Sequence, residues 1–212
     1  MHKVALNTAP KIDWSAIDTV LLDMDGTLLD LHFDTYFWLT HLPKRYAEIH
    51  DLDTEAATLK LHAHIRELEG TLNWYCLEFW SQALNLDICA LKEEIKHKIG
   101  LRPFAMEFLQ GLKALNKKLV LITNAHPQGL SLKLEVTQID RWLDIVISSH
   151  QFQQPKENQA FWQALQACEP FEPGRTLFID DTVRSLDSAR DYGVGHLLCI
   201  HQPDSQKPRT VS

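Results

Sequence analysis

The sequence has few cysteines and no apolar run long enough to cross a membrane. The thiols are widely spaced and form no C-x-x-C pair, at Cys76, Cys89, Cys168 and Cys199. This spacing argues against a disulfide framework and against a zinc site, and it indicates reduced, mostly buried thiols. The first fourteen residues contain no apolar stretch typical of a secretion signal. We therefore expect a cytoplasmic protein with no membrane partner.

An excess of positive charge is also absent. Lys and Arg number 21 against 28 Asp and Glu, so the net charge is −7 and the pI is near 5.8. Non-specific binding to a nucleic acid polymer or an anionic membrane needs a basic surface, and this composition disfavours both. A small phosphorylated molecule can still bind if its pocket supplies a metal ion and a Lys.

Short apolar runs alternate with helical patterns through most of the chain. The runs are continuous rather than alternating and are rich in Val, Ile and Leu, which favours parallel strands covered on both faces. They span 19–24, 118–123, 143–149, 175–180 and 196–200, and crossover helices are expected near 103–115, 127–139, 157–168 and 182–192. The pattern predicts an α/β fold with a doubly wound, Rossmann-like parallel sheet.

Residues 30–100 break this alternation. They contain no convincing strand and many apolar residues at helical spacing, so we expect three or four helices inserted after the first strand. The predicted domains are therefore a core of residues 1–29 and 101–212 and an all-helical insertion of residues 30–100. Such an insertion would stand over the carboxyl end of the sheet, where α/β folds bind ligands.

Polar residues follow the predicted strands at the positions where ligands bind. The first run ends in the sequence DMDGT and the second in Thr-Asn; Pro-Lys follows the third, and the fourth ends in Asp-Asp. Because the carboxyl ends of parallel strands share one edge of a sheet, these groups should converge. They are residues 23–27, 123–124, 155–156 and 180–181.

This set of groups suits phosphate chemistry. A carboxylate that approaches a phosphate dianion meets two unit repulsions, or roughly 8 kcal/mol at about 4 Å and an effective dielectric near 20. A divalent cation and a Lys ammonium reverse that sign, and Mg²⁺ prefers oxygen ligands. Asp23 with Asp180 and Asp181 supplies carboxylates, and the backbone carbonyl of Asp25 offers another ligand. The Asp25 side chain then remains for proton transfer, and Thr123 offers a hydroxyl to the phosphate.

These motifs resemble the haloacid dehalogenase-like phosphatase superfamily, whose four signature positions are all present. The resemblance implies that Asp23 is the nucleophile that forms an aspartyl-phosphate and that Asp25 is the general acid and then the base. It also implies that Thr123 and Lys156 bind the phosphoryl group. The second Asp of the opening motif is typical of the phosphotransferases of the superfamily and absent from its dehalogenases.

The resemblance further implies a Mg²⁺ site in which Asp180 and Asp181 join Asp23 and Asp25. By the same resemblance, residues 30–100 are a C1 cap domain. The segments LLDLHFDTYFW, TLNWYCLEFW and ITNAHP are most similar to superfamily members that are 5'-nucleotidases of purine monophosphates such as GMP and IMP. That similarity implies the same substrate class here.

Several aromatic and amide side chains of the predicted cap are candidates for contact with a base. Aromatic faces stack on bases and Asn can bond to a base edge, so we select Trp74 and Asn73, with Asn124 on the pocket floor. Sugar phosphates, phosphoglycolate and a phosphomutase reaction remain alternatives with the same core. A non-catalytic partner protein would be expected to have lost one of the chemical positions, and none is lost. The sequence does not indicate the oligomeric state.

Overall fold

The structure is a computed structural model that describes residues 11–208. Residues 1–10 and 209–212, which the predicted core domain includes, lie outside the described residues. Five parallel strands form one sheet in the order β3-β2-β1-β4-β5. They are β1 (Thr19–Leu22), β2 (Lys118–Thr123), β3 (Ile145–Ser148), β4 (Thr176–Asp180) and β5 (His196–Cys199). The predicted fold class is confirmed, and each strand lies within its predicted run.

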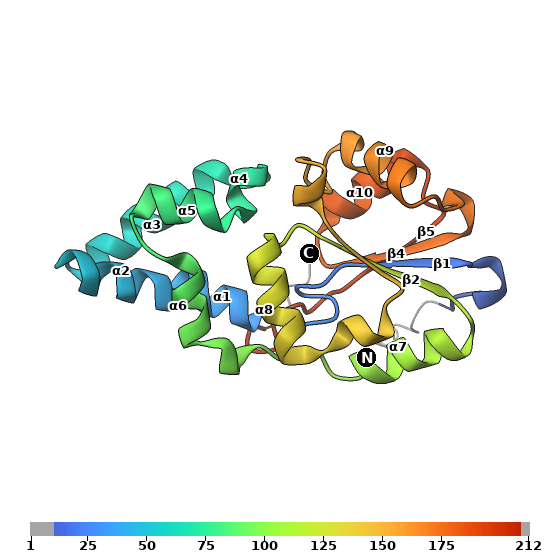
Figure 1. The fold of residues 1–212 in the computed structure, drawn as a ribbon, viewed down its shortest axis with the longest axis horizontal. Helices are drawn as coiled ribbons and strands as arrows, with labels where there is room; N and C mark the ends of the chain where they lie inside the picture. The colour runs from blue at the N-terminus through green and yellow to red at the C-terminus, as the bar shows by residue number, and fades with distance from the viewer. Residues whose placement is uncertain (1–10, 209–212) are drawn as a thin grey trace, which may run out of the picture.

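Helices cover both faces of the sheet, as the continuous apolar runs predicted (Figure 1). The helices are α7 (Ala105–Ala114) and α8 (Pro127–Thr137) on one face, and α9 (Gln159–Cys168) and α10 (Val183–Tyr192) on the other. Successive strand side chains point to opposite faces. Val20 and Leu22 of β1 therefore pack in the cluster that includes α7 and α8, and Leu21 packs against α9 and α10.

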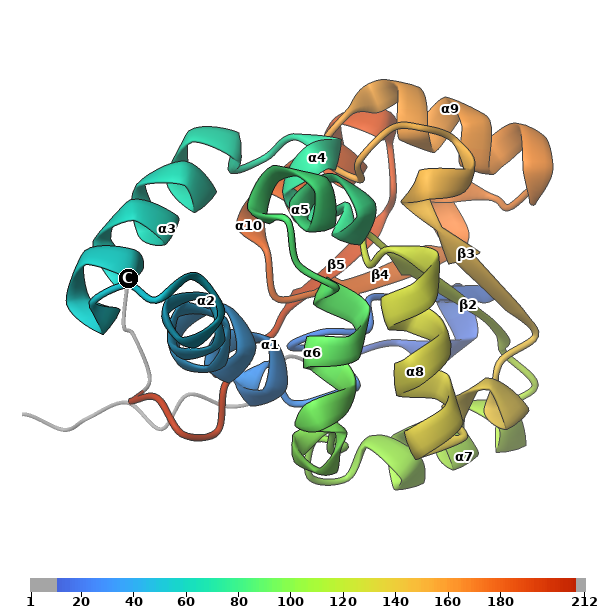
Figure 2. The same cartoon turned by 60° about the vertical axis from the view of Figure 1, so that its left-hand side comes forward.

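The segment 30–100 after β1 consists of helices joined by turns and stands beside the sheet rather than in its layers (Figures 1 and 2). Its α-helices are α1 (His32–Tyr36), α2 (Leu42–His50), α3 (Thr54–Leu68), α4 (Leu72–Tyr75), α5 (Leu77–Leu84) and α6 (Ile88–Glu94). These are more elements than the three or four helices expected, although α1, η2 (Phe37–His41) and α2 run without a break from residue 32 to residue 50, and the chain turns between the others. Asp51, Gly70 and Asn85 take left-handed conformations at three of these turns.

The remaining elements are single turns that join the longer ones. They are η1 (Trp14–Ala16), η2 (Phe37–His41), η3 (Lys96–Lys98), η4 (Ile139–Trp142), η5 (Ser149–Gln151) and η6 (Pro173–Arg175). Within residues 11–208, none of the helices combines the length and the apolar character that crossing a bilayer requires.

The helical segment leaves the sheet and returns to it at one place. Asp30 N–H donates to the Gly100 carbonyl over 2.9 Å, and Arg102 N–H donates to the Leu28 carbonyl, also over 2.9 Å. These two hydrogen bonds join the segment that leaves the sheet and the segment that returns to it, and the two segments run antiparallel. On the far side of this junction α6 packs against α8 (Figure 2). The helical segment therefore lies over the carboxyl ends of β1 and β2.

Candidate active site

Three predicted site residues follow directly from the ends of neighbouring strands. Asp23 comes just after β1, where its N–H donates to the Ile179 carbonyl of β4 over 3.0 Å. Thr123 is the last residue of β2, and Asp180 is the last residue of β4. All three are buried. The order β2-β1-β4 in the sheet places Asp23 between the other two, as the parallel arrangement predicted.

Lys156 joins two of these carboxylates. Its buried Nζ lies 2.5 Å from Asp23 Oδ1 and 2.7 Å from Asp180 Oδ2. Burial alone would lower the pKa of Lys156, but the charges of Asp180 and Asp23 raise it well above its usual range. The backbone N–H of Lys156 donates to Asn124 Oδ1 over 3.0 Å, so the residue after Thr123 holds the lysine loop in place. The ammonium is therefore fixed and charged at neutral pH.

The carboxylates of Asp23, Asp180 and Asp181 form an acidic cluster whose oxygens lie within 4.8 Å of one another. Burial raises the pKa of Asp23, and the neighbouring carboxylates raise it further against the opposing effect of Lys156. Burial and the charge of Asp180 also raise the pKa of Asp181 to about 7. Three carboxylates thus face a single ammonium.

One oxygen of this cluster has no hydrogen-bond partner. Asp23 Oδ2 is buried, and no donor among the described residues reaches it. A buried charged oxygen without a partner is costly, and a cation would compensate for it. The donor set is all oxygen, which is the set that Mg²⁺ prefers. The residues present therefore fit a magnesium ion, which would lie among Asp23, Asp180 and Asp181.

Gly26 lets the first loop approach this cluster. Its φ is +85°, and a Cβ built there would lie 2.6 Å from Asp181 Oδ2 and 2.8 Å from Pro203 Cβ. A side chain at this position would be strained in its backbone and would collide with a carboxylate of the cluster. The Gly of the DMDGT motif is therefore required by the fit between two loops.

Asp25 points away from the acidic cluster, toward the helical segment. Its carboxylate lies 2.7 Å from Lys133 Nζ of α8, and that ammonium lies 2.6 Å from Asp34 of α1. Asp34 also pairs with Lys92 of α6 over 2.7 Å. Burial raises the pKa of Asp25 against the opposing effect of Lys133. The Asp25 carboxylate is not part of the acidic cluster, and the predicted ligation of a metal by its backbone carbonyl stays a prediction.

Asp34, Lys92 and Lys133 were not among the residues predicted from the sequence. Lys133 follows Gly129 and Leu130 at helical spacing on the buried face of α8, and that position is the one signal that could have found it. Asp34 lies within the aromatic stretch LLDLHFDTYFW, which gives no signal of its own for a buried carboxylate. Lys92 lies among other charged residues and gave no signal of burial.

A cavity of about 360 Å³ opens above these groups. Asp23, Asp25, Thr123 and Lys156 line it, and its walls carry Trp38, Trp74, Tyr75 and Trp80 of the helical segment. Such a volume is in the usual range for sites of small organic ligands. Two predicted substrate-binding residues differ in placement: Trp74 lines the cavity, whereas Asn73 is exposed and is not among its lining residues.

Asn124 also lines the cavity, but its side chain is held by protein groups. Its Nδ2 donates to Glu157 Oε2 over 2.9 Å, while its Oδ1 accepts from Lys156 N–H. Tyr75 of the helical segment donates its hydroxyl to the other oxygen of Glu157 over 2.8 Å. The chain Tyr75–Glu157–Asn124 thus connects the helical segment to the lysine loop.

A family model described as haloacid dehalogenase-like hydrolase matches residues 17–193. The chain is 44% identical over 194 residues to the GMP/IMP nucleotidase YrfG of Escherichia coli (strain K12). The aligned residues cover 92% of this chain and 87% of that protein. The nucleotidase of the same name from Shigella flexneri matches with the same identity and coverage.

Solved structures show the same fold at much lower identity. The HAD phosphatase of Thermococcus onnurineus superposes with a TM-score of 0.73 at 21% identity, covering 85% of this chain and 84% of that one. The HAD-hydrolase YfnB of Bacillus subtilis, solved with magnesium, gives a TM-score of 0.62 at 18% identity, covering 92% and 90%. At these identities the likeness concerns the fold alone.

Proposed function

The chain belongs to the haloacid dehalogenase-like hydrolases, and from this premise we propose that it is a Mg²⁺-dependent 5'-nucleotidase of purine nucleoside monophosphates such as GMP and IMP. It is a phosphatase of this family, and the catalytic steps and the purine substrate are the parts proposed here. One observation carries the proposal: the acidic cluster and Lys156 lie at the floor of a cavity whose walls are aromatic. The nucleotidases that are 44% identical over most of both chains support the same substrate.

In the first step, Asp23 is the nucleophile. The Asp23 carboxylate attacks the phosphorus, and the contact of Lys156 with its Oδ1 fixes the direction of the attack. The bond from phosphorus to the ester oxygen breaks, and Asp25 gives its proton to the departing nucleoside oxygen. The raised pKa of Asp25 favours the protonated carboxyl that this step needs.

In the second step, water replaces the aspartyl group. Asp25, now a carboxylate, takes a proton from the water as its oxygen bonds to phosphorus, and the bond to Asp23 breaks to release inorganic phosphate. Thr123 supports the phosphoryl group in both steps. Its Oγ1 accepts from Ala125 N–H over 3.0 Å, which leaves its own hydroxyl proton for a phosphoryl oxygen.

Magnesium would be held by Asp23, Asp180 and Asp181, and it would offset the negative charge of the phosphoryl group and of the attacking carboxylate. Without that cation, Lys156 is the one ammonium within salt-bridge distance of the acidic cluster in residues 11–208. The residues around the cluster therefore bind and orient, while most of the charge compensation falls to the ion.

The proposal includes the division of the chain into two domains. The core is proposed to include the described residues 11–29 and 101–208, and residues 30–100 a cap whose two connections meet at the hydrogen bonds between 28–30 and 100–102. The cap contributes the aromatic wall, and Trp74 is proposed to stack on the purine. Sugar phosphates and phosphoglycolate are the alternative substrates, but they lack an aromatic ring that would stack on such a wall.

The experiment is an assay of phosphate release from nucleoside monophosphates, sugar phosphates and phosphoglycolate, each with Mg²⁺ and with EDTA. We expect Mg²⁺-dependent release from GMP and IMP, and loss of activity by a factor of about 10³ or more in Asp23→Asn. Trp74→Ala should raise KM for GMP severalfold and leave KM for acetyl phosphate, which has no aromatic ring, nearly unchanged. Release from sugar phosphates alone would reject the nucleotidase, and full activity of Asp23→Asn would reject the mechanism.

A further inference from the structure

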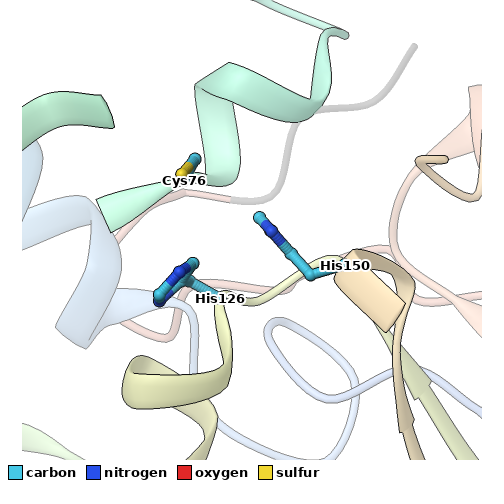
Figure 3. Close-up of side chains that lie close together, drawn as sticks. All are labelled: Cys76, His126 and His150. Carbon is cyan, nitrogen blue, oxygen red and sulfur yellow. The ribbon is translucent and has the colours of Figure 1, made fainter. Parts of the chain in front are cut away.

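A second group of metal-ligating side chains lies outside the acidic cluster, at the junction of the cap and the core. Cys76, His126 and His150 each offer one ligand atom, and these atoms lie within 4.8 Å of one another. Figure 3 shows the three side chains gathered in the space between the two parts, each from a different element. Cys76 lies between α4 and α5 of the cap, His126 precedes α8, and His150 lies in η5 after β3.

We propose that Cys76, His126 and His150 bind a zinc ion that fastens the cap to the core. This inference goes beyond the proposed function and does not depend on it. The absence of a C-x-x-C pair argued against a zinc site from sequence alone, but that argument concerns ligands that are close in the chain. Here the ligands are 50 and 24 residues apart and are brought together by the fold.

The type of ligand selects the metal. A thiolate and two neutral imidazoles are typical of Zn²⁺, whereas Mg²⁺ requires oxygen ligands. Tetrahedral Zn²⁺ at its usual bond lengths of about 2.0–2.3 Å places its ligand atoms about 3.3–3.8 Å apart. The ligand atoms lie within 4.8 Å of one another, which exceeds these separations by about 1.0–1.5 Å at most, so rotations of the side chains complete the site. A fourth position remains for water.

The hydrogen bonding of the histidines also leaves room for a metal. His150 Nε2 is buried without a hydrogen-bond partner among the described residues, which is costly for a ring nitrogen. His126 is only 8% exposed, and its Nδ1 accepts from Gln128 N–H over a long 3.4 Å. Exchange of that weak contact for a metal bond costs little. The two rings lie edge to face with their centroids 5.0 Å apart.

Cys76 is suited to the third position because hydrogen bonds of its Sγ and of the preceding residue already hold it in place. Its Sγ accepts from Phe79 N–H at the start of α5 over 3.4 Å. The preceding residue, Tyr75, is bonded to Glu157 of the core. The thiol is therefore held toward the core by a contact that is independent of any metal. A metal bond at Cys76 would add to the Tyr75–Glu157 contact and would restrain α4 and α5 over the cavity.

The test uses zinc itself as the probe, on full-length protein stripped of metal and then kept in excess Mg²⁺. Competition with a chromogenic chelator measures the zinc affinity of wild type, Cys76→Ser, His150→Gln and the control Cys168→Ser. Cys76→Ser retains an acceptor for Phe79 N–H, and Cys168 is exposed at the end of α9 and is not a member of the cluster. Thermal unfolding confirms that each variant folds.

We expect one tight zinc equivalent in wild type and Cys168→Ser, and affinity lower by about tenfold or more in Cys76→Ser and His150→Gln. Cobalt in place of zinc should give a thiolate-to-metal absorption band in wild type and in Cys168→Ser. Cys76→Ser should lack this band. Zinc should also slow amide hydrogen exchange over residues 72–84 in wild type and not in Cys76→Ser. Equal zinc affinity of wild type and Cys76→Ser, or exchange unchanged by zinc in wild type, would overturn the proposal.

Discussion

The ammonium group of Lys133 lies 2.7 Å from the carboxylate of Asp25, the proposed general acid. The same ammonium lies 2.6 Å from Asp34, which also pairs with Lys92. Asp25, Asp34, Lys92 and Lys133 thus form one network that runs from α8 to α1 and α6 of the proposed cap. The position of the cap and the position of the proposed proton donor are therefore coupled through one side chain.

Replacement of Lys133 by Met should lower kcat for nucleotide hydrolysis by about tenfold or more. Without its partner, the Asp25 carboxyl is free to turn from the leaving oxygen, and removal of one partner from a buried network also destabilises the fold by about 3–5 kcal/mol. The loss of kcat should be smaller with p-nitrophenyl phosphate, whose leaving group needs little protonation. Stopped assays on both substrates and chemical denaturation measure these effects.

The matched control for this variant is Lys113→Met, because Lys113 pairs with Asp144 in a partly exposed position. Partly exposed pairs contribute about 1 kcal/mol or less, so its activity and stability should stay near those of wild type. An equal loss of kcat on both substrates in Lys133→Met would contradict a role in placing the acid and would leave only a structural one.

Replacement of Lys156 by Met should make the stability of the protein depend more strongly on Mg²⁺. The substitution leaves Asp23 and Asp180 buried with no ammonium between them, at a cost of about 3–5 kcal/mol. A bound cation restores part of the missing positive charge and stabilises only the folded state. The difference in Tm between Mg²⁺ and EDTA should therefore be larger in Lys156→Met than in wild type.

Thermal unfolding with Mg²⁺ and with EDTA measures that difference, and Lys118→Met, at a partly exposed lysine, is the control. If Mg²⁺ raised the Tm of Lys156→Met and the Tm of wild type by the same amount, the acidic cluster would not be the magnesium site. Activity of Lys156→Met should fall below detection in either condition, because the nucleophile loses its fixed direction.

The sequence was enough to predict which groups meet at the edge of the sheet, but not the contacts that link the helical segment 30–100 to the rest of the chain. Asp23, Thr123 and Asp180 follow continuous apolar runs, and parallel strands bring such positions together regardless of the chain between them. Their proximity was predictable for that reason, while their roles stay predictions. The Lys133–Asp34 pair joins residues 99 apart through the packing of helices, and helix packing leaves no periodic signal for a pair.

Replacement of Tyr75 by Phe should weaken substrate binding more than it weakens the fold. The variant loses one hydrogen bond, from the cap to Glu157, while Asn124 still donates to that carboxylate. A net loss of about 1 kcal/mol is usual for such a bond and corresponds to a KM about fivefold higher if the contact holds the cap closed over substrate. Steady-state kinetics measure KM, with Tyr192→Phe as the control; an unchanged KM would show that this contact does not restrain the cap.

Replacement of Gly26 by Ala should damage both stability and the proposed metal site. The φ of +85° costs a residue with a Cβ about 1–2 kcal/mol, and the Cβ would lie 2.6 Å from Asp181 Oδ2, so that carboxylate must move. We expect the free energy of unfolding to be lower by about 2 kcal/mol and half-maximal activity to need a higher Mg²⁺ concentration.

Gly111→Ala is the matched control, because Gly111 lies within α7 with no atom within 4 Å of its built Cβ. Ala at this position should stabilise the helix by up to about 1 kcal/mol. If Gly26→Ala lost stability but kept the wild-type Mg²⁺ dependence, Asp181 would be free to move without harm, and its place among the metal ligands would be wrong.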